Sequence, residues 1–172
     1  MIPVSDRNDA REYAEGAFLR ASAMWALAGL TGAFGTMFLD FSRGHFDFVS
    51  LSRELTLGLA GGVLGLGHSR YQYFLLESFP GHYADLARLS KEGWTLWKGR
   101  QGASHVRPVV HPGRGWAPLA YGGALLVIVG LAVLLYRGFP PVSSAFFALG
   151  GFFLARVIFW KRAVDLWKSE GS

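Results

Sequence analysis

Apolar residues of this chain gather into four blocks, and the segments between the blocks hold most of the charged side chains. The blocks cover about residues 17–39, 55–75, 117–136 and 143–160. Each is close to the roughly 20 residues that an α-helix needs to cross a bilayer, and the short alternating pattern of a membrane β-barrel is absent. The pattern therefore predicts an all-α polytopic membrane protein, with four transmembrane helices in a single membrane domain over residues 1–172.

Lysine and arginine are distributed unevenly around these blocks. Of the 17 Lys and Arg residues, only Arg43, Arg53 and Arg137 fall in the two short connections. The other fourteen lie in the N-terminal, central and C-terminal segments or in the adjoining ends of the blocks. Cytoplasmic segments carry the excess of positive charge, so we expect both termini and the central segment to be cytoplasmic.

With a formal net charge of +5, we expect the protein to interact with the lipid bilayer and not with nucleic acid. The positive residues lie beside apolar blocks, where anionic lipid headgroups are within reach. Arginine is also far commoner than lysine in this chain, which favours a prokaryotic plasma (inner) membrane as the location.

The central segment contains an amphipathic stretch over about residues 79–98. On a helical wheel, charged side chains fall on one arc, and the opposite arc holds Phe79, Tyr83, Leu86, Ala87, Trp94 and Trp97. Tryptophan rings favour the membrane–water boundary, so we expect a helix lying in the cytoplasmic interface; docking on a partner protein is the alternative. Pro80 and Gly81 separate it from the second block, and residues 99–116 form a basic loop.

Small residues recur four apart in the second block. Gly58 and Gly62 form one ridge of a helix, and Gly61 and Gly65 form the neighbouring ridge. Membrane helices associate through close backbone approach at such positions. We expect one ridge to pack inside the bundle and the other to meet another subunit.

Several side chains near the block ends are expected at the lipid interface. Long cationic side chains there extend toward the headgroups, and the residues concerned are Arg20, Arg156, Trp94, Trp97 and Trp160. A second interpretation concerns the end of the second block. There His68, Arg70, Tyr71 and Tyr73 would line a pocket for a quinone, a pigment or a lipid.

The sequence lacks the residues that most catalytic mechanisms require. No cysteine is present, which excludes thiolate nucleophiles and cysteine-ligated metals. A haem held by two intramembrane histidines of this chain is excluded as well, because His68 has no second histidine at its depth. No metal site is predicted, since Asp40, His45 and Asp47 form only a weak cluster in a solvated loop. Nucleotide and nucleophile motifs are missing, so we do not expect an enzyme.

Three functions fit these features. The first is a non-catalytic accessory or assembly subunit of a larger membrane complex, packed through its glycine-rich helices. The second is a membrane anchor subunit of a respiratory or photosynthetic complex that contributes to a quinone or pigment pocket. The third is a small channel or a lipid-handling protein.

Overall fold

The computed structural model describes residues 4–44, 47–92, 109, 116–137 and 142–170. Within these residues the chain is helical, and the all-α prediction is confirmed for them. The helices follow one another as α1 (Val4–Tyr13), the π-helical segment η1 (Ala14–Arg20), α2 (Ala21–Ser42), α3 (Phe48–Ser78), α4 (Pro80–Glu92), α5 (Ala117–Tyr136) and α6 (Val142–Glu170).

Three helical stretches of the described residues are long and apolar enough to cross a membrane: Ser5–Ser42, Leu119–Tyr136 and Val142–Ser169. The first of these joins α1, η1 and α2 into one rod. Helix α3 has 31 residues but is not among the three, because Arg53, Glu54, His68 and Arg70 interrupt its apolar run. The predicted count of four spans is therefore not confirmed by helix length and hydropathy.

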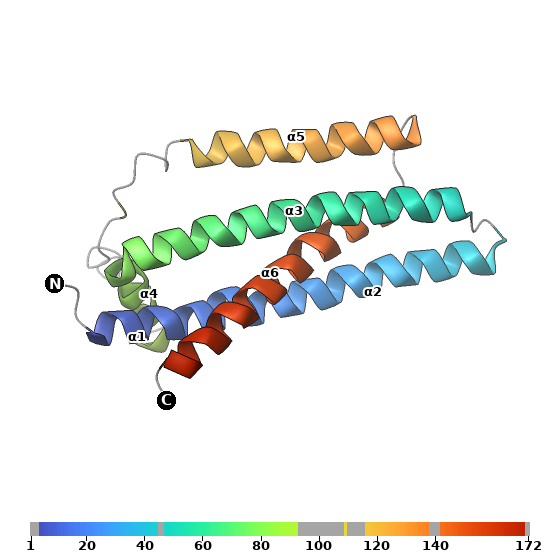
Figure 1. Ribbon diagram of the computed structural model, residues 1–172. Helices are drawn as coiled ribbons and strands as arrows, with labels where there is room; N and C mark the ends of the chain where they lie inside the picture. Colours follow the sequence, from blue (N-terminus) through green and yellow to red (C-terminus); the bar gives the residue numbers. More distant parts are fainter. Residues whose placement is uncertain (1–3, 45–46, 93–108, 110–115, 138–141, 171–172) are drawn as a thin grey trace.

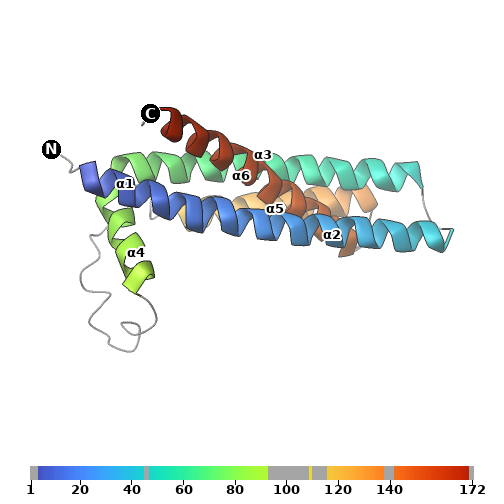
Figure 2. The same cartoon turned by 90° about the horizontal axis from the view of Figure 1, so that it is seen from below.

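Helix α6 joins the bundle together. It crosses α2 and α3 and packs against both, whereas α5 lies along the far side of α3 (Figure 1). Both ends of the described chain lie at the same end of the bundle, and there α4 turns away from the long helices (Figure 2). The turn follows the sequence locally: α3 ends at Ser78, and Pro80 is the first residue of α4, a position that suits proline because its missing N–H has no helical partner there.

The glycines of α3 lie against α6. A Cβ atom at Gly61 or Gly65 would overlap the carbonyl oxygen of Ala148 or Phe152, respectively. Such close approach lets dispersion contacts and weak Cα–H···O contacts replace the hydrophobic effect, which does not drive association inside a bilayer.

The other glycine ridge of α3 also faces α6, which corrects an expectation. Gly58 lies beside the carbonyl oxygen of Phe147, and Gly62 lies beside that of Gly151. Gly151 has no side chain, and a Cβ there would overlap the Gly58 carbonyl oxygen. A thin part of α6 therefore contacts both ridges, in place of the two different partners that were expected.

An aromatic cluster fills the end of the bundle that holds both termini. Its buried members come from four helical segments and α4, namely Ala10, Ala14, Phe18, Leu76, Tyr83, Trp160, Ala163, Val164 and Trp167. Trp160 has none of its surface exposed, so its expected place at the lipid interface is wrong. The long helices continue past the expected spans and pack on one another there, which encloses the indole ring.

Helix α4 turns part of its apolar arc toward the bundle. Tyr83, Ala84 and Ala87 are buried, and Arg88 forms ion pairs of 2.9 and 3.0 Å with Asp6 and Asp9 of α1. These hydrogen-bonded carboxylates raise the pKa of Arg88. This part of the arc therefore contacts its own chain and not lipid, in contrast to the expected interfacial helix. Trp94 and Trp97 lie outside the described residues.

Candidate functional site

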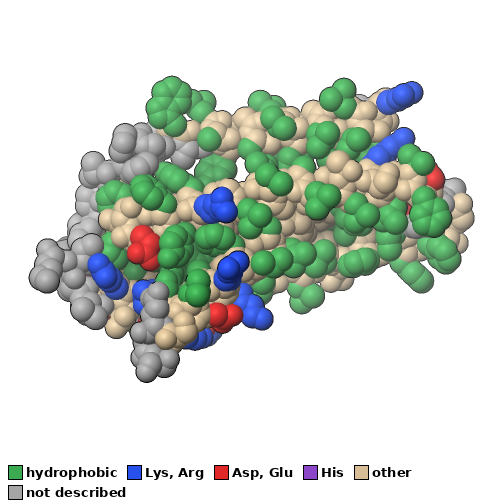
Figure 3. All heavy atoms as spheres, in the orientation of Figure 1, with side chains coloured by type: hydrophobic (Ala, Val, Ile, Leu, Met, Phe, Trp, Pro, Cys, Tyr) green, Lys and Arg blue, Asp and Glu red, His purple; other side chains and the backbone are tan. Residues whose placement is uncertain are grey.

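A large apolar groove lies between α3, α5 and α6. Its volume is about 1070 Å³, and openings between α5 and the rest of the bundle are visible in Figure 3. Almost all of its lining is apolar, and it includes Leu57, Leu64, Ala124, Ile128, Ala145, Leu149 and Phe152. The volume is slightly above the range typical of small-molecule sites, roughly 300–1,000 Å³.

A polar pair marks one end of this groove. The hydroxyl group of Tyr121 on α5 hydrogen-bonds Nδ1 of His68 on α3, and both residues line the groove. The His68 ring also lies 5.8 Å from the ring of Phe152 on α6, measured between centroids. With Nδ1 paired, Nε2 is the nitrogen of this ring with remaining hydrogen-bonding capacity. The pair gives an otherwise apolar groove one end that can form hydrogen bonds.

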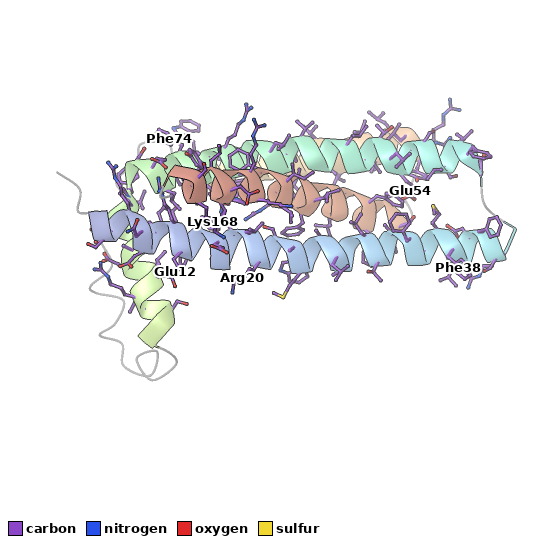
Figure 4. All side chains as sticks on the ribbon, turned by 60° about the horizontal axis from the view of Figure 1, so that its bottom comes forward. Glu12, Arg20, Phe38, Glu54, Phe74 and Lys168 are labelled. Atoms are coloured by element: carbon purple, nitrogen blue, oxygen red, sulfur yellow. The ribbon has the colours of Figure 1, made fainter. Side chains whose placement is uncertain are left out.

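A buried carboxylate holds the opposite end of α5. Glu54 of α3 is 7% exposed, and its Oε1 accepts hydrogen bonds from Tyr136 of α5, at 3.0 Å, and from Ser143 of α6, at 2.5 Å. The guanidinium of Arg53 lies 5.4 Å from the centre of the Tyr136 ring. Figure 4 shows Glu54 inside the bundle, while Arg20 points away from it.

These two contacts fasten α5 at both ends. Tyr121 and Tyr136 are 15 residues apart, and their partners His68 and Glu54 are 14 apart in the opposite order. At 1.5 Å per residue the spacings are about 22 and 21 Å, so the two antiparallel helices match. Between the two tyrosines, small side chains such as Ala124 leave the groove open.

Arg156 of α6 is buried close to the His68 end. It is 9% exposed, and it donates to Ser22 of α2 at 3.0 Å and to Gln72 of α3 at 3.1 Å. Its guanidinium also lies 5.7 Å from the centre of the Phe152 ring. The expected position of Arg156 at the lipid interface is therefore wrong, because both hydrogen bonds turn its side chain into the bundle.

The structure separates the pocket residues that the sequence suggested. His68 and Tyr71 line the groove. Arg70 is exposed. Tyr73 stacks on Trp167 in the aromatic cluster, with ring centroids 6.0 Å apart. Residues on one helix at these spacings cannot all share a face, so the proposed set of four does not form one site.

A second, small cavity of about 30 Å³ borders Glu54. Asp40, Asp47 and Ser50 are among its lining residues, and Asp47 also caps α3 by accepting a hydrogen bond from the Val49 amide at 3.1 Å. Within the described residues, no three His, Asp or Glu side chains are grouped so that they could hold a metal ion. His45, the third member of the weak cluster considered from sequence, lies outside those residues.

Sequence reasoning missed the two tyrosines of α5 and the burial of Glu54. The matched spacings of Tyr121 and Tyr136 with His68 and Glu54 were a usable signal, because antiparallel helices bring such positions together in pairs. That signal has meaning only once α3 and α5 are known to be neighbours. No protein family, curated protein or solved structure was found to match this chain.

Proposed function

We propose that this protein is a non-catalytic membrane subunit that holds a long-chain lipophilic molecule in the groove between α3, α5 and α6. The observation that carries the proposal is the groove itself: about 1070 Å³ of almost wholly apolar space with the His68–Tyr121 pair at one end. An acyl or isoprenoid tail suits the walls, and a head that forms hydrogen bonds suits the pair. Of the three functions that fit the sequence, this proposal draws on the second, the subunit with a quinone or pigment pocket, and on the lipid-handling part of the third.

The arrangement of the helices supports a four-span topology as part of this proposal. Helix α5 carries no charged side chain, and residues such as Leu126 and Leu134 are more than 70% exposed. Hydrocarbon is the solvent that suits such a surface. Because α3 lies between α5 and α6, a bilayer that covers both of these helices also encloses α3. Its polar residues Glu54 and His68 face bundle partners there.

The orientation within the membrane completes the proposal. We place both termini on the cytoplasmic side of a prokaryotic plasma membrane. The reason is that most Lys and Arg residues lie in or beside the N-terminal, central and C-terminal segments, which share one side of the membrane in the four-span topology. The His68 end of the groove then faces the cytoplasmic leaflet. The aromatic cluster and α4 stand beyond it, on the cytoplasmic side.

The test is to identify what the groove holds after purification in a mild detergent. Organic extraction followed by mass spectrometry should give a long-chain lipophile at close to one molecule per chain. Substitution Ala124→Trp fills the groove and should remove it. Val127→Trp is the matched control, because Val127 lies on the same helix and is 70% exposed but does not line the groove.

Three outcomes would contradict the proposal. Equal retention of the molecule in both variants would place it on the outer surface. Absence of any lipophile from the wild-type protein would leave the groove without its occupant. Loss of a partner protein, rather than a lipid, from the Ala124→Trp variant would favour the assembly subunit, and a visible absorption band in the extract would identify a pigment.

A further inference from the structure

We infer that the molecule held in the groove carries an anionic oxygen head, a carboxylate or a phosphate, recognised by Arg156 together with His68 and Tyr121. This inference rests on the proposed function and specifies the class of ligand. Its observations are the position, the burial and the missing counter-charge of Arg156.

Arg156 lies next to the α6 wall of the groove. Ala145, Leu149 and Phe152 line the groove from α6, and Arg156 follows Phe152 by four residues, one helical turn further along the same stripe. The guanidinium lies over the Phe152 ring, which in turn contacts the His68 ring. The guanidinium is therefore one aromatic ring away from the polar end of the groove, where Ser22 and Gln72 hold it.

The described residues supply this cation with no carboxylate. Its hydrogen-bond partners, the hydroxyl of Ser22 and the amide oxygen of Gln72, are both neutral. A guanidinium has five N–H donors, so two bonds leave capacity for a ligand. Charged side chains at membrane depth are expensive to keep and mark binding sites or ion pathways. A buried positive charge beside an apolar groove favours a negative head over a neutral one.

The His68–Tyr121 pair is compatible with the same head. Because one proton is shared between the Tyr121 hydroxyl and His68 Nδ1, a neutral pair keeps one donor for a ligand, either the His68 Nε2–H or the Tyr121 hydroxyl. A donor at a fixed position complements carboxylate or phosphate oxygens. Bonds that involve an ionised group are about twice as strong as neutral ones. The tail of the ligand then runs from this end toward Leu57 and Ile128, between the two fastened ends of α5.

The experiment compares heads on one tail, using the wild-type protein in neutral detergent. An 18-carbon fatty acid, the corresponding alcohol and the corresponding amine are titrated by native mass spectrometry. The acid is expected to bind roughly tenfold more tightly than the alcohol, and the amine more weakly than both. Phosphatidylglycerol and phosphatidylcholine with the same acyl chains form the second arm, which distinguishes a phosphate-bearing anionic lipid from a free carboxylate.

Variants test whether Arg156 is the origin of the preference. Arg156→Gln should abolish the difference between acid and alcohol, and Arg156→Lys should retain part of it. Arg162→Gln is the control, because Arg162 is an exposed arginine on the same helix. Retained binding of the alcohol shows that a variant is folded. If Arg156→Gln does not fold, the comparison of the acid, the alcohol and the amine on the wild-type protein tests the preference for an anionic head by itself.

The outcomes separate this inference from the proposed function. If the alcohol binds as tightly as the acid, or if Arg156→Gln keeps the preference, the anionic head is wrong and the groove still holds a lipophile. If none of the five probes binds and the purified protein contains no lipophile, the proposed function itself fails.

Discussion

Tyr136, the last residue of α5, donates a hydrogen bond of 3.0 Å to Glu54, a buried carboxylate 82 residues earlier in the chain. The second oxygen of that carboxylate, Oε2, is buried and has no hydrogen-bond partner among the residues that the structure describes. Glu54 is therefore only partly satisfied, and each bond to its Oε1 matters more than a bond at the surface would. Tyr136 is thus the contact that ties the far end of α5 to α3.

Loss of the Tyr136 hydroxyl alone should lower the stability of the protein more than loss of both Tyr136 and Glu54 as hydrogen-bonding partners. We expect Tyr136→Phe to lower the free energy of unfolding by about 1–3 kcal/mol, because it deprives a buried acceptor of its donor. Replacement of both partners, in Tyr136→Phe with Glu54→Leu, should recover part of that loss. Thermal unfolding in detergent of the four proteins of this double-mutant cycle gives the coupling energy.

The control for this cycle is the other end of α5. Tyr121→Phe combined with Glu54→Leu should be additive to within about 0.5 kcal/mol, since sites further apart than roughly 10 Å rarely couple. Strong coupling in the control pair, or none between Tyr136 and Glu54, would contradict the view that α5 is fastened at two separate points.

A methyl group at Gly61 should disrupt the seam between α3 and α6. Gly61→Ala places a Cβ atom on the Ala148 carbonyl oxygen, and relief requires backbone movement. We expect a loss of about 1–3 kcal/mol of stability, measured as a lower midpoint of thermal unfolding. Gly67→Ala on the same helix is the matched comparison, because nothing lies within 4 Å of a Cβ there. Equal effects at the two positions would show that helix propensity, and not packing, dominates.

The fourth span depends on α3, and its two ends can be labelled. The chain contains no cysteine, so Ser52→Cys and Ser78→Cys each introduce a single thiol, both at exposed positions. In intact cells or oriented vesicles, a membrane-impermeant maleimide should reach Cys at position 52 from outside and Cys at position 78 only after permeabilisation. Labelling of both from the same side would eliminate α3 as a span.

The packing of α4 should depend on alkaline pH. Burial raises the pKa of Tyr83 to about 12, compared with about 10 in an unfolded chain. A raised pKa means that the folded state retains the proton, so the stabilisation is complete below about pH 10 and is lost as the pH rises toward 12. A tyrosinate absorbance titration of the protein and of Tyr83→Phe should isolate this group. If the titration step that disappears in Tyr83→Phe lies near pH 10, the aromatic cluster does not enclose Tyr83 as described.

The glycines illustrate how far a local pattern extends. Gly58, Gly61, Gly62 and Gly65 stand out in the sequence because close backbone approach depends on residue size alone. The spacing of the glycines does not show which helix packs against them, and in the structure that helix is α6. The expectation that the two ridges meet different partners was wrong, because α6 is thin at Gly151 and contacts both of them.

The sequence by itself determined the helical class, three of the membrane-crossing candidates and the break at Pro80, because these follow from block length, hydropathy and local backbone sterics. Only the tertiary structure decided which polar residues are buried and what they meet. Arg156 contacts Ser22 across 134 residues, and Tyr121 contacts His68 across 53. Periodicity carries no information on such pairs. Whether an arginine near the end of an apolar block turns toward lipid or into the bundle depends on which neutral partners the neighbouring helices place beside it.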